Sequence, residues 1–238
     1  MRPPADVDPH RGSQHSLLPS LPAITQRLVA IVVLSVAFVA MTMAITAGLF
    51  TTLDKQVAQT MHSIWQESLH PLFQLIAELG GIEVTSILML ALFIYLLRGG
   101  FGADALVVVA FVGAVALEVL YKSLLYHPGP PLSISHPDGP SLTGQFSDSL
   151  GNSFPSGHMV RTVVVYGLLA FVVRRLSRSR TARSLAIPVA IAVIVVMVVD
   201  RLYLDVHWES DVIGGLLLGG IALAAATVWL DRPRKAEN

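Results

Sequence analysis

The sequence contains no cysteine, and only 13% of its 238 residues are charged. Without cysteine the chain forms no disulfide and offers no thiolate for catalysis or metal binding. Lys and Arg together number 16, as do Asp and Glu, so the balanced charge predicts no nucleic-acid partner. Soluble domains carry about a quarter charged residues. The scarcity of charge, together with 53% hydrophobic residues, indicates an integral membrane protein.

Long apolar runs separated by polar segments predict an all-α, polytopic membrane protein, built as a six-transmembrane-helix bundle. The six expected spans are residues 28–50, 72–97, 103–121, 158–173, 185–204 and 212–230. Each is close to the roughly 20 residues that cross the hydrocarbon core as a helix. The first run is too long for the apolar core of a signal peptide, so we expect it to remain as a helix.

The segments outside these runs predict the domain organisation. Residues 1–26 are rich in Pro, Ser and His and predict a mobile cytoplasmic tail. Residues 27–230 form the expected six-span domain, and residues 231–238 a short cytoplasmic tail. The outer loop of this domain, residues 122–157, is expected to carry part of the functional site. Its polar stretch, residues 128–152, has a length that is usually functional or mobile in a compact chain.

The basic residues predict the orientation in the membrane. Most of them lie near the two termini or in the cluster from Arg174 to Arg183, between the fourth and fifth spans. Because cytoplasmic loops are enriched in Lys and Arg, this side is expected to be cytoplasmic. The cluster fits a topology anchor better than a site for anionic lipid. We therefore expect a multi-pass plasma-membrane protein with both termini cytoplasmic and residues 128–152 outside.

The opposite, extracytoplasmic face is expected to hold the residues that can perform chemistry. They are Lys122 at the end of the third span, Ser156, Gly157 and His158 at the start of the fourth, and Arg201, His207 and Asp211 between the fifth and sixth. Cations together with helix N-terminal amides are typical of a phosphate site. A histidine followed four residues later by a carboxylate is typical of an oriented nucleophile or base.

These segments resemble the type-2 phosphatidic acid phosphatase family, which shares its core with vanadium haloperoxidases. The family carries the motifs K-x6-R-P, P-S-G-H and S-R-x5-H-x3-D. The second is complete at residues 155–158, and the third is matched at full spacing by Arg201, His207 and Asp211. Lys122 and Pro130 match the first. The resemblance covers residues 72–230 and implies a membrane lipid phosphatase rather than a haloperoxidase, because the haloperoxidases are soluble.

The resemblance also implies a role for each motif residue. His207 would be the nucleophile that forms a phosphohistidine, and Asp211 would hold its other ring nitrogen. His158 would be the general acid that protonates the leaving oxygen. Lys122, Arg201, Ser156 and the backbone N–H of Gly157 would bind the phosphoryl oxygens. Asp211 can also be the N-cap of the last helix. No metal or other cofactor is implied.

Two positions depart from the family pattern. Gly129 stands where the first motif has arginine, and Asp200 stands where the third has serine. Arg161 lies one turn beyond His158 on the same helix face and is a candidate substitute for binding phosphate. The alternative for Arg161 is a helix-packing role. His127 is a second candidate, although the planar fork of arginine fits phosphate better.

Other polar residues near the motifs have simpler interpretations. Glu118 lies one turn before Lys122 and is expected to be its ion-pair partner or part of the pocket wall. Trp208 is expected to be an interfacial aromatic anchor. His127 and His136 share the outer loop with Asp138 and Asp148, but their spacing fits no metal motif, so solvated loop residues are favoured over a metal site.

Three functions remain open from the sequence. The first is hydrolysis of a lipid phosphate at the outer face, on a polyprenyl diphosphate, phosphatidic acid or phosphatidylglycerol phosphate. The second is a lipid phosphotransferase, which passes the phosphoryl group to another lipid. The third is a non-catalytic phospholipid-binding or transport protein, which Gly129 favours and the intact His158, His207 and Asp211 oppose. The expected partners are the lipid substrate and the bilayer.

Overall fold

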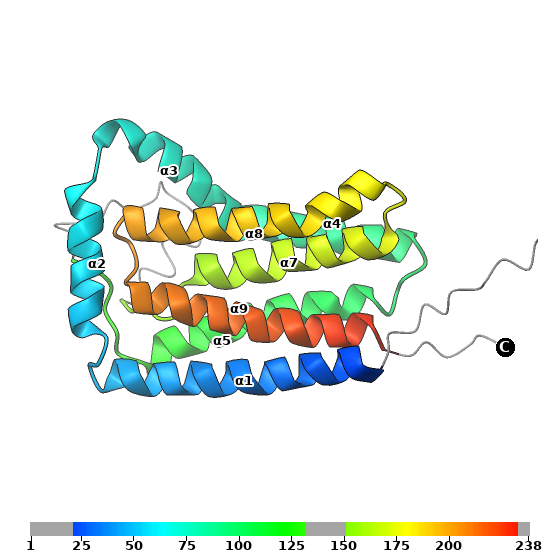
Figure 1. The fold of residues 1–238 in the computed structure, drawn as a ribbon, viewed down its shortest axis with the longest axis horizontal. Helices are drawn as coiled ribbons and strands as arrows, with labels where there is room; N and C mark the ends of the chain where they lie inside the picture. Colours follow the sequence, from blue (N-terminus) through cyan, green and yellow to red (C-terminus); the bar gives the residue numbers. More distant parts are fainter. Residues whose placement is uncertain (1–20, 132–150, 233–238) are drawn as a thin grey trace, which may run out of the picture.

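The structure is a computed structural model that describes residues 21–131 and 151–232. Within these ranges every regular element is an α-helix or a short 3-10 helix. The long helices are α1 (Leu21–Thr46), α4 (Ile82–Arg98), α5 (Val108–Leu124), α7 (Gly157–Leu176), α8 (Arg180–Tyr203) and α9 (Glu209–Leu230). They lie side by side along one direction (Figure 1). The predicted all-α fold class is confirmed.

Shorter helices connect the long ones. They are α2 (Thr51–Ser63), η1 (Glu67–Leu69), α3 (His70–Ala77), η2 (Glu78–Gly80) and η3 (Ala105–Val107). α2 runs across one end of the bundle, at a steep angle to the long helices (Figure 1). The second predicted span, residues 72–97, is divided into α3 and α4. Gly81 precedes α4 in an extended conformation (φ −59°, ψ 151°), which changes the chain direction between them.

Within the described residues, five stretches are long and apolar enough to cross a membrane. They are Ala23–Thr46, Glu67–Arg98, Ala105–Leu124, Arg180–Tyr203 and Glu209–Leu230. The fourth predicted span, residues 158–173, is helical as α7 but is not among them, so the count of six spans stays a prediction. α7 is the central helix, because α4, α5, α8 and α9 all contact it. It buries Arg161 among its apolar side chains.

The outward surfaces of the peripheral helices are apolar. Val32, Val36 and Met43 on α1 are each more than 60% exposed, and Ile87 on α4 and Val109 on α5 are exposed to a similar degree. Continuous apolar surface of this kind marks contact with a membrane or a partner. With helices of this length and composition, lipid is the natural neighbour of these faces.

Glycines on α9 allow it to lie close to α7. A Cβ at Gly215 would lie 2.6 Å from the carbonyl oxygen of Ser156, and a Cβ at Gly219 would lie 3.0 Å from that of Val160. Small residues four apart share one helix face and permit close helix packing in membranes. Larger side chains here would separate the starts of the two helices, and with them His158 from the segment that precedes α9.

The first helix begins earlier than its hydropathy predicts. α1 begins at Leu21, so the boundary expected at residue 26 moves toward the N-terminus. Thr25, Gln26 and Arg27 in its second turn lower the hydropathy there without breaking the helix. Pro22 is tolerated because backbone N–H groups in a first turn have no partner within the helix. The rest of the predicted tail, residues 1–20, lies outside the described residues.

The two ends of the bundle differ in character. At one end, the start of α1 and the end of α9 meet (Figure 1), where Arg27 and Arg175 both pair with Asp231. Arg232 pairs nearby with Asp104 at 3.0 Å. At the other end, the last turns of α5 and α8 lie with the first turns of α7 and α9 beside α2. The polar residues of the motifs all belong to this second end.

Candidate active site

Four helix ends and one connecting segment carry the predicted site residues. Lys122 lies in the last turn of α5, His158 in the first turn of α7, and Arg201 in the last turn of α8. His207 precedes α9, and Asp211 lies in its first turn. The motifs are distant in sequence but adjacent here. Arg201 Nη1 lies 3.4 Å from His158 Nδ1, and the backbone N–H of Ser156 donates to the Asp211 carbonyl oxygen at 3.0 Å.

Asp211 contacts His207 and also caps its own helix. One carboxylate oxygen, Oδ2, lies 3.4 Å from His207 Nδ1 and accepts the backbone N–H of Trp208 at 2.9 Å. The carboxylate is fully buried. The expected N-cap position of Asp211 is wrong, because Trp208 is the N-cap of α9 and Asp211 is the third residue of the helix. From there Asp211 accepts the N–H of the N-cap residue and also faces His207. Because Nδ1 faces the carboxylate, Nε2 is the ring nitrogen left to act on a substrate.

The surroundings of His207 favour its neutral form. Burial lowers the pKa of His207, the contact with Asp211 opposes this in part, and the charges of Lys122 and Arg201 lower it further. The net shift is downward, so the imidazole is uncharged at neutral pH. A neutral imidazole with one nitrogen facing a carboxylate can serve as a nucleophile or a base.

Asp200 gives Arg201 a second partner in addition to His158. Arg201 Nε donates to Asp200 Oδ2 at 2.8 Å, and both side chains are almost completely buried. This carboxylate stands where the family motif has serine. It holds one edge of the guanidinium fork, while Nη1 on the other side faces His158. Asp200, in place of the motif serine, therefore orients Arg201 and also offsets its positive charge.

Glu118 joins the two other cations of the site. Its Oε1 lies 3.3 Å from Lys122 Nζ, which confirms the predicted ion pair, and its Oε2 lies 3.0 Å from Arg161 Nη1. Arg161 Nε also donates to the carbonyl oxygen of Gly80 at 3.0 Å. Arg161 thus ties α7 to α5 and to η2. These contacts support a packing role for Arg161, and its role in binding phosphate stays a prediction.

The absence of a side chain at Gly157, the glycine of the PSGH motif, leaves room for the Glu118 side chain. A Cβ at Gly157 would lie only 1.9 Å from Glu118 Oε1, so a larger residue would displace this carboxylate from its place beside Lys122 and Arg161. The neighbouring Ser156 is fully buried, and its Oγ makes no hydrogen bond within the described residues. A buried hydroxyl without a partner is costly. A ligand oxygen would satisfy it.

His127 makes a contact that the sequence did not predict. Its Nε2 lies 3.3 Å from Oδ1 of Asp211, the oxygen that does not face His207. Gly129 lies near Ser153: a Cβ added at Gly129 would lie 3.4 Å from the Cβ of Ser153. The available signal was the pair His127–Pro128, a basic residue before proline two positions earlier than the family's R-P pair.

Asp54 is the second residue that sequence reasoning missed. It lies on α2, is buried, and accepts both the backbone N–H and the Oγ–H of Ser210 at 2.9 Å. Burial raises the pKa of Asp54, although the Ser210 hydrogen bonds oppose this. The contact fastens α2 to the start of α9. No sequence motif marked Asp54, because α2 has the composition of a polar linker.

The remaining loop predictions are only partly covered by the structure. Trp208 was expected to be a membrane anchor; its Nε1–H donates to the carbonyl oxygen of Pro128 at 2.8 Å and so fastens the outer loop. His136, Asp138 and Asp148 lie outside the described residues. Within residues 21–131 and 151–232, no group of three or more His, Asp or Glu side chains could hold a metal ion.

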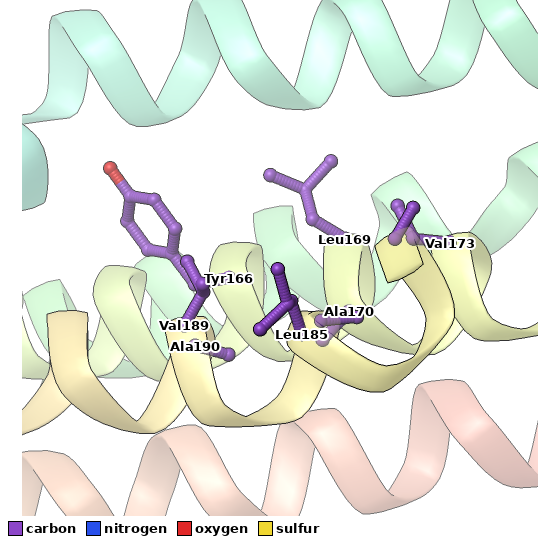
Figure 2. A pocket seen from close by; sticks show the side chains of 9 residues that line it. Tyr166, Leu169, Ala170, Val173, Leu185, Val189 and Ala190 are labelled. Atoms are coloured by element: carbon purple, nitrogen blue, oxygen red, sulfur yellow. The ribbon is translucent and has the colours of Figure 1, made fainter. Parts of the chain in front are cut away.

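A groove between α7 and α8 is chemically different from this site. Tyr166, Leu169 and Val173 of α7 line it together with Leu185 and Val189 of α8 (Figure 2). Small alanines from both helices complete the lining. The surface is almost entirely apolar, so the groove offers no group for phosphate chemistry.

The helical architecture and the clustered motif residues define a class: multi-pass membrane proteins with a polar site at one end of the bundle. Comparison with known proteins gives the family. A model of the PAP2 superfamily matches residues 101–235, which is more than half of the chain. The chain therefore belongs to the PAP2 superfamily, and the predicted resemblance is confirmed.

A curated protein and a crystal structure that are similar to this chain both come from Bacillus subtilis. Phosphatidylglycerophosphatase B of strain 168 is 37% identical over 68 residues, which are 28% of this chain and 34% of that protein. The match thus spans about a third of the relative's length. The crystal structure of the first transmembrane PAP2 type phosphatidylglycerolphosphate phosphatase has a TM-score of 0.68 at 24% identity. It covers 83% of this chain and 94% of that one, a likeness of fold.

Proposed function

We propose that this protein is an integral membrane lipid phosphatase that works through a phosphohistidine on His207. The observation that carries the proposal is the contact between His207 Nδ1 and the buried Asp211 carboxylate at 3.4 Å, beside Lys122 and Arg201. Because this contact engages Nδ1, the other ring nitrogen of His207, Nε2, is the one that attacks phosphorus. Membership in the PAP2 superfamily supports the same chemistry.

The reaction takes place in two displacements. In the first, Nε2 of His207 forms a bond to phosphorus while the bond from phosphorus to the lipid oxygen breaks, and His158 gives that oxygen a proton. In the second, water attacks the phosphohistidine, His158 takes the proton of the water, and inorganic phosphate leaves with the Nε2–P bond broken. Asp211 offsets the positive charge on the imidazole in both steps.

Phosphoryl oxygens are held by groups that converge on the start of α7. Lys122 and Arg201 supply positive charge, and the N–H of Gly157 lies in a helix first turn. Ser156 Oγ supplies a hydroxyl that has no other partner among the residues that the structure describes. Such donors strengthen as negative charge shifts onto the equatorial oxygens. Arg161 acts on the same cluster through the Glu118 carboxylate that it shares with Lys122.

The proposed substrate is a lipid phosphate presented at the outer face of the plasma membrane. Phosphatidylglycerol phosphate is the first candidate, because the similar curated protein and the similar crystal structure are both named for that activity. Phosphatidic acid and polyprenyl diphosphate are the next. The basic residues at the end of the bundle opposite the site, Arg27 and Arg175 among them, support an outward-facing site with both termini cytoplasmic.

Phosphate release from purified lipids tests the proposal. The full-length protein in detergent is mixed with each of the three lipid phosphates, and inorganic phosphate is measured for wild type and His207→Ala. We expect release by the wild type and none by the variant, with no loss on adding a chelator, because Lys and Arg supply the charge. No release from any of the three lipids, or equal release by both proteins, would overturn it. Label appearing in a second lipid would instead identify a phosphotransferase.

A further inference from the structure

Asp211 lies between two imidazole rings. Its Oδ2 is 3.4 Å from His207 Nδ1, and its Oδ1 is 3.3 Å from His127 Nε2. The carboxylate is fully buried, so solvent screens neither contact effectively. A carboxylate between two histidines raises the pKa of both. Its effect on the pKa of one histidine depends on whether the other histidine is charged.

Backbone hydrogen bonds fix the position of His127. Its N–H donates to Asn152 Oδ1 at 2.9 Å, and its carbonyl oxygen accepts Ser153 N–H at 2.8 Å and Ser153 Oγ–H at 3.1 Å. Asn152 Nδ2 in turn donates to the carbonyl oxygen of Lys122 at 2.9 Å. The ring meets Phe154 edge-on, with centroids 6.3 Å apart. His127 is therefore held against Asp211 by structure on both sides of the outer loop.

We propose that His127 is a positioning residue that acts through Asp211, moderating the carboxylate so that His207 stays neutral and nucleophilic to lower pH. The inference rests on the proposed function, because it concerns the reactivity of the proposed nucleophile. It assigns to His127 a contact with the carboxylate rather than with the phosphate of the substrate.

The charged form of His127 is favoured where it lies. Burial lowers the pKa of His127, but the contact with Asp211 and the negative charges of Asp211 and Asp54 outweigh it, so the net shift is upward. His127 therefore takes up a proton at a higher pH than an ordinary histidine. Its positive charge then offsets the carboxylate of Asp211 before His207 is protonated.

The consequence for His207 follows from the sign of each charge. Asp211 is the neighbour that raises the pKa of His207, whereas burial, Lys122 on α5 and Arg201 on α8 lower it. Once His127 is charged, the pull of Asp211 on a proton at His207 weakens. His207 then stays unprotonated further into the acid range than it would beside an unshared carboxylate.

The pH profile of kcat/KM tests the inference directly. Dioctanoyl phosphatidic acid in mixed micelles is the probe, and wild type is compared with His127→Gln, which is neutral at every pH, and with His127→Lys, which stays charged. We expect the midpoint of the acid limb to move up by about one pH unit in His127→Gln. In His127→Lys it should stay at or below the wild-type value. The titration of the substrate is the same in all three proteins and cancels.

His62→Gln is the matched control, since His62 lies on α2 with Nδ1 3.9 Å from Asp205 rather than near Asp211. Its profile should coincide with the wild type. A uniform loss in His127→Gln with an unchanged midpoint would make His127 a structural residue and overturn the inference, as would no change at all. His127→Asn repeats the neutral substitution, so a folding failure in one variant leaves the other to decide. A wild type without phosphate release would refute the proposed function itself.

Discussion

Glu118 on α5 and Arg161 on α7 form an ion pair inside the bundle, with Oε2 and Nη1 3.0 Å apart. The other oxygen of Glu118 faces Lys122 at 3.3 Å. Two cations at the site thus depend on one carboxylate. Loss of either partner from a buried ion pair leaves an uncompensated charge, which is more harmful than loss of both.

The first prediction concerns Arg161. Arg161→Ala should lower kcat/KM by about 10- to 100-fold, the scale of one charged hydrogen bond. It should also lower the melting temperature, because Glu118 loses a partner. Arg161→Lys should restore only part of the activity, since one amine cannot reach both Glu118 and the Gly80 carbonyl as the guanidinium does.

A double substitution separates packing from phosphate binding at Arg161. Glu118→Gln also takes the carboxylate from Lys122, so the effect of Arg161→Ala is compared in the wild-type and Glu118→Gln backgrounds. In the Glu118→Gln background, Arg161→Ala should lower the melting temperature less than it does in the wild type, because the ion pair is already gone. If Arg161 also contacts phosphate, Arg161→Ala should still lower kcat/KM in that background. No further loss of kcat/KM there would show that Arg161 acts only by packing against Glu118.

The second prediction concerns Asp211. Asp211→Asn should lower kcat by about 10⁴-fold, as in other histidine–carboxylate pairs, because an amide cannot offset the charge of the imidazole. The Asn oxygen can still accept the Trp208 N–H, so the capping contact at the start of α9 should be retained. A kcat within tenfold of the wild type would contradict the assigned role of Asp211.

The third prediction concerns Asp205 in the turn between α8 and α9. Burial raises the pKa of Asp205 from its usual value of 3.8 to about 7. Because the folded-state pKa is raised, the folded protein loses stability as pH rises from about 4 to about 7. Asp205→Asn should therefore raise the melting temperature at pH 8 and have little effect at pH 4. Asparagine suits the positive φ of 50° at this position. Equal melting temperatures at pH 8 would contradict the prediction.

The fourth prediction concerns orientation. Cysteine replaces residues singly in this cysteine-free chain, at Tyr126, which is 86% exposed at the site end, and at Arg178 between α7 and α8. In intact cells an impermeant thiol reagent should label position 126 but not position 178. Permeabilised cells should show both labels, which controls for access. Labelling of 178 alone in intact cells would reverse the proposed topology.

Much of the architecture could be predicted from the sequence because membrane-spanning helices are recognisable by their length and apolar composition. Each of the expected spans overlaps a helix, and the motif residues lie at helix ends that meet. The helix boundaries were less predictable. Hydropathy missed the start of α1, where the polar residues Thr25, Gln26 and Arg27 follow the first turn, and did not resolve the break between α3 and α4. Short helices such as α2 have neither the length nor the apolarity to stand out.

The pairing of charges could not be predicted from spacing alone. Glu118 and Lys122 are four residues apart on one helix, so their contact followed from helix geometry. The contacts of Arg161 with Glu118 and of His127 with Asp211 join residues far apart in sequence, and they depend on how the helices and loop pack. Asp54 and Ser210 pair across a still longer separation.

The central claim is that phosphate passes through His207, and trapping the intermediate tests it most directly. The protein is mixed with a lipid phosphate carrying radiolabelled phosphorus, quenched in alkali within milliseconds, and digested to locate the label. We predict label on the peptide that contains His207, stable to alkali and released by acid, and none in His207→Ala. Wild-type turnover with no protein-bound label in such samples, or label that persists in His207→Ala, would contradict the account.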